Sequence, residues 1–340
     1  MASNKTTFVA TALDLIRDAE RRVADGENSP TLVRDYKQRL KLHCEPFFGG
    51  MRVNAIDARK LREFRKHLSD KSLKASTALT VMSFVSKVLS LAEEDGVILA
   101  KPKVPRGGHK DAPRPAFTAS EYGHLKATLK RIEHGKPTVE FKGSVVDKEL
   151  RLITTFMVNS FLRPGDIFVL KHKHLQVITP PDEPAYLRLS LPPSKNHSHD
   201  TVSLPAAVFI YKNVTAHNAK KGLGTSPNDY VFLPGRQSRA YAKEIVRRQF
   251  AEVLRIAGLS ENAKGEKRSL YSLRHSAIIF RLVNSDGLDL VTLARAARTS
   301  VEMIDRFYAS TLTAEMNRAK LFSFKRASRY NQAERASAGG

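Results

Sequence analysis

The segment LYSLRHSAIIFRLV, residues 270–283, places an arginine near the start of an otherwise apolar stretch. The apolar residues predict a helix buried in the core of a folded domain. Backbone N–H groups at the start of a helix attract anions, and a guanidinium binds them through two parallel hydrogen bonds. Arg274 is therefore a candidate anion-binding residue, and capping of a neighbouring helix is its ordinary structural alternative.

Two further cationic residues occupy comparable positions. Arg163 follows an apolar helical segment and directly precedes a Pro-Gly turn, where a guanidinium is well placed to bind an anion. Lys195 falls between AYLRLSL and HDTVSLP, two alternating segments that predict paired strands. Taken singly, each has a structural alternative, because Arg163 could pair with Asp166 and Lys195 could lie in solvent.

The chain before these segments has helical periodicity over residues 5–100. The segment KASTALTVMSFVSKVLSLAEEDG predicts an amphipathic helix that Ser76 caps and Gly96 ends. Pro46 is expected to end an earlier helix, and Asp57 to cap the next one. The beginning of the chain is thus predicted to be a small helical bundle.

The segment KPKVPRGGHKDAPRP, rich in proline, glycine and basic residues, predicts a linker. After it, helical segments alternate with the two predicted strands, so the fold class is mainly α with a small β-sheet (α+β). The predicted organisation is a helical domain over 1–105, a linker over 106–115, a mixed domain over 116–328 and a flexible tail over 329–340.

The charge balance indicates a polyanionic partner. Lys and Arg number 57 against 34 Asp and Glu, which gives +23, and the excess is spread over both halves of the chain. A basic folded surface suits nucleic acid, whereas the alternative is a charge that serves only solubility. Arg34, Lys37 and Lys74 are the candidate DNA contacts of the helical domain, with a solvated charged face as their alternative.

Other classes of protein fit the sequence less well. No long apolar run or secretory leader is apparent, and Cys44 is the only cysteine, so a cytoplasmic location and no membrane partner are expected. The 11 histidines form no metal-binding pattern, and neither GxxxxGK[ST] nor GxGxxG is present. Chemistry without a metal or a nucleotide cofactor is therefore expected.

Four segments in order resemble the tyrosine recombinase (phage-integrase) family. They are FLRPGDIFVLKHKHL with Arg163, SLPPSKNHSHDTVSLP with Lys195, LYSLRHSAIIFRLV with Arg274, and RTSVEMIDRFYAS with Tyr308. The resemblance covers residues 8–325 and implies a helical core-binding domain followed by a catalytic domain. It implies an enzyme in which Tyr308 attacks DNA to form a 3′-phosphotyrosyl bond, two arginines bind the phosphate, and Lys195 protonates the leaving 5′-oxygen.

The resemblance also implies partners. These are double-stranded DNA recombination sites, a homotetramer on paired sites and accessory DNA-bending proteins, with a nucleoid-associated location in a bacterium. Neither metal nor ATP is required, because the phosphotyrosyl bond conserves the energy of the phosphodiester. A DNA-binding or architectural protein without cleavage activity, and a relaxing enzyme similar to type IB topoisomerases, are the alternative functions.

Two positions depart from the family pattern. Tyr271 stands where the family usually has histidine, and Thr299 stands where it has histidine or tryptophan, with Arg298 in place of the preceding glycine. The motifs YSLRH and TSVxMI resemble a phage-type branch of the family. A phenol is a poor general base near neutral pH, so the proton acceptor is open, and His275 is a candidate whose ordinary role is structural packing.

Overall fold

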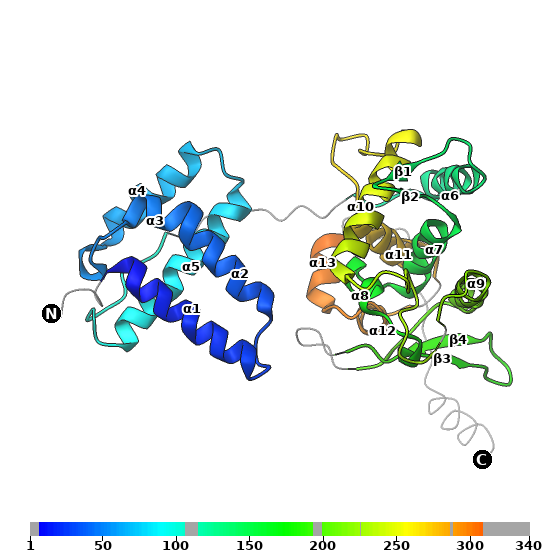
Figure 1. Ribbon diagram of the computed structural model, residues 1–340, viewed down its shortest axis with the longest axis horizontal. Helices are drawn as coiled ribbons and strands as arrows, with labels where there is room; N and C mark the ends of the chain where they lie inside the picture. The colour runs from blue at the N-terminus through cyan, green and yellow to red at the C-terminus, as the bar shows by residue number, and fades with distance from the viewer. Residues whose placement is uncertain (1–6, 106–114, 193–198, 225, 286–287, 309–340) are drawn as a thin grey trace, which may run out of the picture. The chain divides into compact units, whose positions relative to one another are not determined.

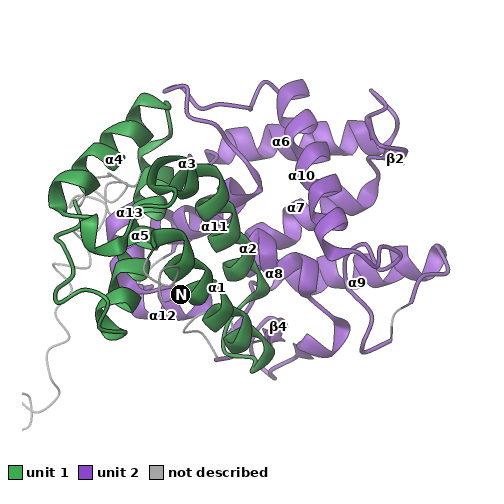
Figure 2. Cartoon of the chain, turned by 60° about the vertical axis from the view of Figure 1, so that its left-hand side comes forward, with its two compact units in different colours: residues 1–111 green, residues 112–340 purple. Residues whose placement is uncertain are grey.

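The computed structural model describes residues 7–105, 115–192, 199–224, 226–285 and 288–308 (Figure 1). The chain divides into two compact units, residues 1–111 and residues 112–340 (Figure 2). Each has its own buried apolar cluster. Most of the predicted linker, the tip with Lys195 and the predicted tail lie outside the described residues.

The described part of the first unit is helical. Its elements are α1 (Phe8–Ala24), α2 (Pro30–Arg39), a π-helical turn (Leu40–Cys44), α3 (Glu45–Phe48), a 3-10 turn (Val53–Ala55), α4 (Ala58–Asp70) and α5 (Ala75–Glu94). Asp57 caps α4 as predicted, since its Oδ1 accepts the Lys60 N–H at 2.7 Å. The prediction for Pro46 was wrong, because it lies in the first turn of α3, where a missing N–H costs nothing.

Helix α5 forms the centre of the first unit. It starts two residues earlier than its predicted cap allows, with Lys74 rather than Ser76 at the N-cap, and Gly96 follows its end at φ 68°. By length and composition alone α5 could cross a membrane. However, its residues Val81, Val85 and Val88 are completely buried in the first unit's core, as expected of the central helix of a bundle.

The second unit is mixed. Its elements are α6 (Ala119–Glu133), β1 (Glu140–Phe141), β2 (Ser144–Val145), α7 (Lys148–Ser160), α8 (Pro164–Val169), a 3-10 turn (His172–His174), β3 (Leu175–Ile178), β4 (Tyr186–Leu189), β5 (Thr201–Val202), α9 (Ala206–Lys220), α10 (Arg239–Ile256), α11 (Leu270–Asn284), α12 (Leu290–Ala296) and α13 (Val301–Tyr308). Helix α7 packs against α6, α9 and α11, so the apolar segment that precedes Arg163 is a core helix as predicted.

The small sheet carries the connection that contains Lys195. Strands β3, β4 and β5 are antiparallel neighbours in that order. β4 and β5 are the two strands predicted from sequence, and they pair Arg188 with Val202 and Leu189 with Thr201. β3 and the short β1–β2 pair were not predicted. The predicted mainly helical fold with a small sheet is confirmed.

Candidate active site

Arg274 is a buried cation held between the ends of two helices. It lies in α11, is 3% exposed, and its guanidinium donates hydrogen bonds to the carbonyls of Phe161 and Ala297. Phe161 is the C-cap of α7 and Ala297 the C-cap of α12. The last carbonyls of a helix lack intrahelical partners and carry partial negative charge, so they stabilise a cation at this point.

Arg163 is held in a similar way. Its Nη2 donates to the carbonyl of Arg298 at 2.5 Å, and its backbone N–H, rather than its guanidinium, bonds the Asp166 carboxylate at 3.1 Å. The Nη1 atom of Arg163 is buried and has no hydrogen-bond partner among the described residues. A buried N–H donor without an acceptor is costly, so this atom is available to an incoming acceptor.

Two of the residues whose carbonyls accept from the arginines, Phe161 and Arg298, have left-handed backbone conformations. Phe161 has φ 57° and Arg298 has φ 47°, a region that costs a side-chain-bearing residue about 1–2 kcal/mol. The turn after α12 thereby presents consecutive carbonyls, of Ala297 to Arg274 and of Arg298 to Arg163. Glycine, which the sequence comparison expected at position 298, would adopt this left-handed φ without a steric penalty.

The two guanidinium groups make the site electropositive. Burial, and to a smaller extent the nearby Arg163, lower the pKa of Arg274 to about 10, while Tyr271, Tyr308 and Asp166 oppose the shift. Arg274 thus remains protonated near neutral pH. Among the described residues, the hydrogen-bond acceptors of both guanidinium groups are neutral carbonyls, which leave much of the positive charge uncompensated. An anion bound between them would relieve their mutual repulsion.

Tyr308 lies beside the arginines and is bonded to a histidine. It is the last residue of α13, it is 5% exposed, and its hydroxyl shares a hydrogen bond with Nδ1 of His275. Burial raises the pKa of the Tyr308 phenol, whereas the nearby Arg274 lowers it. The ring centroid of His275 is also 5.1 Å from that of Tyr271. His275 therefore contacts the one atom of Tyr308 that would have to lose a proton.

Two more of the predicted residues of the second unit, Thr299 and Tyr271, lie around this cluster. Thr299 ends the turn after α12, where its N–H donates to the Ala294 carbonyl at 2.9 Å. Tyr271 and Arg163 both line a cavity of about 700 Å³ that also has Lys243, Arg247 and Lys267 in its wall. Lys195 is outside the described residues.

The described ends of the Lys195 connection can be placed. The carbonyl of Pro192 accepts from the Arg298 guanidinium at 3.3 Å, and His199 Nε2 lies 3.3 Å from the Arg295 carbonyl. The Thr201 hydroxyl donates to the Ala296 carbonyl at 2.7 Å. The described residues on both sides of the connection therefore contact either the last turn of α12 or the turn that follows it.

The candidate DNA contacts of the first unit are exposed. Arg34 lies 3.6 Å from Asp35, and Lys37 pairs with Glu20 at 2.7 Å. Lys74 is exposed at the N-cap of α5. Nothing in their surroundings distinguishes them from other solvated charges, so their role in binding remains a prediction.

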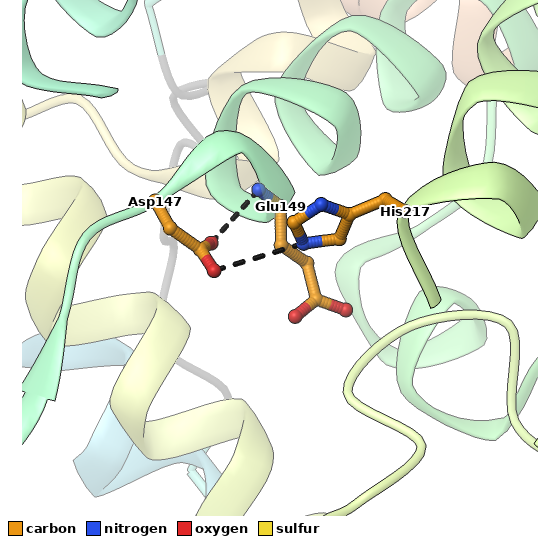
Figure 3. A group of neighbouring side chains, drawn as sticks. All are labelled: Asp147, Glu149 and His217. Atoms are coloured by element: carbon orange, nitrogen blue, oxygen red, sulfur yellow. Dashed lines mark hydrogen bonds and ion pairs between the residues drawn. The ribbon is translucent and has the colours of Figure 1, made fainter. Parts of the chain in front are cut away.

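A second polar cluster could in principle hold a metal ion. Asp147, Glu149 and His217 each offer a ligand atom, and these atoms lie within 4.8 Å of one another (Figure 3). However, Asp147 already accepts the Glu149 N–H at 2.9 Å and the Lys221 ammonium at 2.5 Å, and Glu149 accepts the Leu233 N–H at 2.6 Å. The ammonium supplies the positive charge there, so the cluster is best explained as the N-terminal cap of α7.

This cluster was not recognised from the sequence. Its members come from α7 and α9, which only the fold brings together. Burial raises the pKa of Glu149 and lowers that of His217, so the environment favours the neutral form of each.

Comparison with solved structures identifies proteins with a similar fold. A Tn1549 transposon integrase in complex with transposon right-end DNA has a TM-score of 0.66 at 14% identity, over 93% of this chain and 98% of that one. A lambda integrase dimer bound to a core site has a TM-score of 0.59 at 17% identity, over 86% and 92%. A lambda integrase tetramer bound to a Holliday junction has a TM-score of 0.61 at 16% identity, over 96% and 81%.

No family model and no curated protein sequence matches the chain. The structural likeness extends over both units, and it shows that the chain has the fold of tyrosine recombinases. At these identities the likeness establishes the fold alone.

Proposed function

We propose that the protein is a site-specific DNA recombinase of the phage-integrase type, which cuts and rejoins DNA through Tyr308. The observation that carries the proposal is the pair of guanidinium groups, the half-buried Arg163 and the buried Arg274, hydrogen-bonded to neutral carbonyls beside a buried tyrosine hydroxyl. A phosphodiester supplies the anion that this pair lacks, and its charge grows on the non-bridging oxygens during attack.

Each remaining group has a role in the proposed reaction. The Tyr308 oxygen attacks phosphorus while its proton passes to Nδ1 of His275, with which it already shares a hydrogen bond. The bond from phosphorus to the 5′-oxygen breaks, and Lys195 gives that oxygen a proton. Attack by a 5′-hydroxyl on the phosphotyrosyl bond reverses these steps and rejoins the strand. Tyr271 and Thr299 supply hydrogen bonds to the phosphate from the two positions where histidines are usual.

The proposed partners follow from the charge and from the structural neighbours. Double-stranded DNA fits the net charge of +23, and the neighbours include integrases in complex with DNA and a tetramer on a Holliday junction. We therefore include a tetramer on paired sites, a DNA-binding role for residues 1–105 with Arg34, Lys37 and Lys74, accessory DNA-bending proteins and a cytoplasmic, nucleoid-associated location in the proposal.

Formation of a covalent adduct tests the proposal. Duplexes selected from a randomised library by binding to the full chain provide a site, which is then nicked next to the cleavage position so that the released 5′ fragment diffuses away. The wild type should accumulate a protein–DNA adduct that survives denaturation, whereas Tyr308→Phe should form none and still bind the duplex. Equal adduct from both proteins would reject Tyr308 as the nucleophile.

The same substrates separate the alternatives. Tight binding without any adduct from the wild type would favour a DNA-binding protein that lacks cleavage activity. An adduct together with relaxation of a supercoiled one-site plasmid, and without exchange between two sites, would favour a relaxing enzyme. Exchange between two sites is the outcome that the proposed function requires.

A further inference from the structure

A cavity beside Arg163 combines apolar surface with positive charge. It has a volume of about 700 Å³ and is lined by α8, α10 and the segment that leads into α11. Its apolar lining residues are Pro164, Phe250, Ala251 and Leu270. Three exposed cations also line it, namely Lys243, Arg247 and Lys267. A ligand that fits this cavity would therefore have both an apolar part and a negative charge.

The charge of the lining is only partly neutralised. Arg268, which also lines the cavity, is paired with Glu121 at 2.7 Å. In contrast, neither Lys243 nor Lys267 has an ion pair with any residue that the structure describes. Asp166 is the one carboxylate in the described lining, and its Oδ2 already accepts a backbone N–H. The two lysines therefore favour an anionic ligand.

The cavity adjoins the candidate active site. Arg163 and Tyr271 line it, and Arg163 carries a buried Nη1 atom that has no hydrogen-bond partner among the described residues. Helix α10, which carries Lys243, packs against α8, which begins directly after Arg163. A ligand that reaches from the two lysines to Arg163 would thus occupy the cavity and the proposed phosphate site together.

A strand of DNA matches this arrangement better than a free nucleotide does. Its backbone alternates deoxyribose rings, which can pack on apolar side chains, with phosphates, which attract the lysines. Successive phosphates of one strand advance about 3.4 Å along the helix axis. A strand whose scissile phosphate is bound by Arg163 and Arg274 must therefore place neighbouring phosphates close to the cavity, whereas a free nucleotide has no such neighbours.

We propose that Lys243, Lys267 and Arg247 bind phosphates of the cleaved strand within about three nucleotides of the scissile phosphate. This inference rests on the proposed function, and it adds contacts in the second unit to those predicted in the first. Contacts of this kind position the strand without reading its sequence. Their loss should therefore weaken binding by a similar factor on every duplex and leave the site preference unchanged.

Duplex binding at several salt concentrations is the first test. For Lys243→Ala with Lys267→Ala, the affinity should fall about tenfold at about 150 mM salt, and the slope of log affinity against log salt should decrease by about two. Lys212→Ala with Lys220→Ala is the matched control, since these exposed lysines of α9 also lack ion pairs among the described residues and lie outside the cavity lining. The control should bind like the wild type.

Helix α10 offers a second matched pair. Arg247 and Arg255 each bond a glutamate three residues earlier at 2.6 Å, Glu244 and Glu252 respectively, but of the two only Arg247 lines the cavity. Glu244 also bonds Arg248 at 2.8 Å, so loss of Arg247 does not leave it unpaired. Arg247→Ala should reduce the salt slope by about one, whereas Arg255→Ala should not change it.

Neutral phosphate analogues test the contacts one by one. Methylphosphonates, in which a methyl group replaces one charged oxygen, are placed singly at each position of the selected duplex. The wild type should bind less tightly when a contacted phosphate is replaced. The double lysine variant should show no further loss at those positions, because the phosphate charge there already lacks its partner. Thermal unfolding of each variant shows that it is folded.

Three results would overturn the inference. Equal duplex affinity of the double lysine variant and the wild type would exclude the strand, and stabilisation of the wild type alone by a deoxynucleoside monophosphate would then assign the cavity to a free nucleotide. Equal losses in both proteins at every methylphosphonate position would mean that the lysines act indirectly. Contacted phosphates far from the cleavage position would place the strand elsewhere.

Failure of the proposed function has a different signature. Absence of any covalent adduct from the wild type would overturn cleavage through Tyr308. The methylphosphonate positions would still show whether the lysines of the cavity bind a DNA strand, since that measurement needs binding alone.

Discussion

The arginines of α1 and those of the candidate active site differ in what surrounds them. On α1, Arg17 and Arg21 pair with Asp14 and Asp18 three residues earlier, and their side chains are 69% and 77% exposed. Surface pairs of this kind contribute little to stability and are screened by salt. Each of these arginines is balanced by an aspartate, so the pairs add nothing to the net charge and indicate no function.

In the second unit, Arg163, Arg274 and Arg298 have carbonyl acceptors, and Arg274 and Arg298 are almost fully buried. Burial of a cation with neutral acceptors costs free energy, and a bound anion would offset part of that cost. The comparison shows that the net charge of +23 suggests nucleic acid but does not locate a site. Guanidinium groups gathered on neutral backbone carbonyls, with Asp166 as a nearby carboxylate, do locate one.

Neutralising a buried arginine should have the largest effect. Arg274→Gln removes a charge on the phosphate, so the cleavage rate at saturating DNA should fall by about 10³-fold. Arg21→Gln, from the exposed set, is the matched control and should cleave at the wild-type rate. Single-turnover cleavage of the nicked duplex measures both. A loss of less than tenfold for Arg274→Gln would remove the distinction between buried and exposed arginines.

Removal of the proton acceptor should have the next largest effect. His275→Phe retains an aromatic ring but cannot accept the Tyr308 proton, so cleavage at neutral pH should fall by about 10²-fold. Without the base, attack depends on the phenolate, whose fraction rises about tenfold per pH unit below its pKa. Since burial raises that pKa above its ordinary value, the variant's rate should still be rising at about pH 10.

A pH–rate profile in single turnover checks this prediction. His275→Phe should approach the wild-type rate as the pH increases, because hydroxide replaces the missing base. A profile parallel to that of the wild type at every pH would show that His275 only packs against Tyr308. In that case a residue other than His275 would accept the Tyr308 proton.

The smallest effect is expected on the surface of the first unit. If Arg34, Lys37 and Lys74 contact phosphates, the triple alanine variant should bind duplex DNA about tenfold more weakly at 150 mM salt. The slope of log affinity against log salt should decrease by about one per lost contact. Cleavage at saturating DNA should not change. Arg17→Ala with Arg21→Ala is the control pair, and an identical slope for both variants would reject these three residues as contacts.

Local signals predicted much of the fold. Asp57 caps α4 as expected, and the alternation of β4 and β5 predicted their pairing. These features depend on residues close together in sequence. The errors were also local: Ser76 has the right chemistry for a cap, but α5 begins at Ala75 with Lys74 as its cap.

The candidate site was predicted in part. The order of Arg163, Arg274 and Tyr308 indicated the chemistry, and the structure brings all three together. The contact between Tyr308 and His275 was not predicted, because a histidine next to a buried arginine on a helix is usually explained by packing. The burial of Arg298 was missed too, since the sequence marked it only as a replacement for glycine.

The sequence by itself therefore determined the residue types, the helices and strands that carry them, and a net charge suited to a polyanion. Only the tertiary structure decided which groups meet. The carbonyls of residues 161, 297 and 298 accept hydrogen bonds from Arg163 and Arg274, because the ends of α7 and α12 lie next to these two side chains. The sequence could not predict these contacts, since every residue has a backbone carbonyl. The physical reason is that a buried cation is stabilised by whatever dipoles the fold places around it, and those dipoles come from helices far apart in the chain.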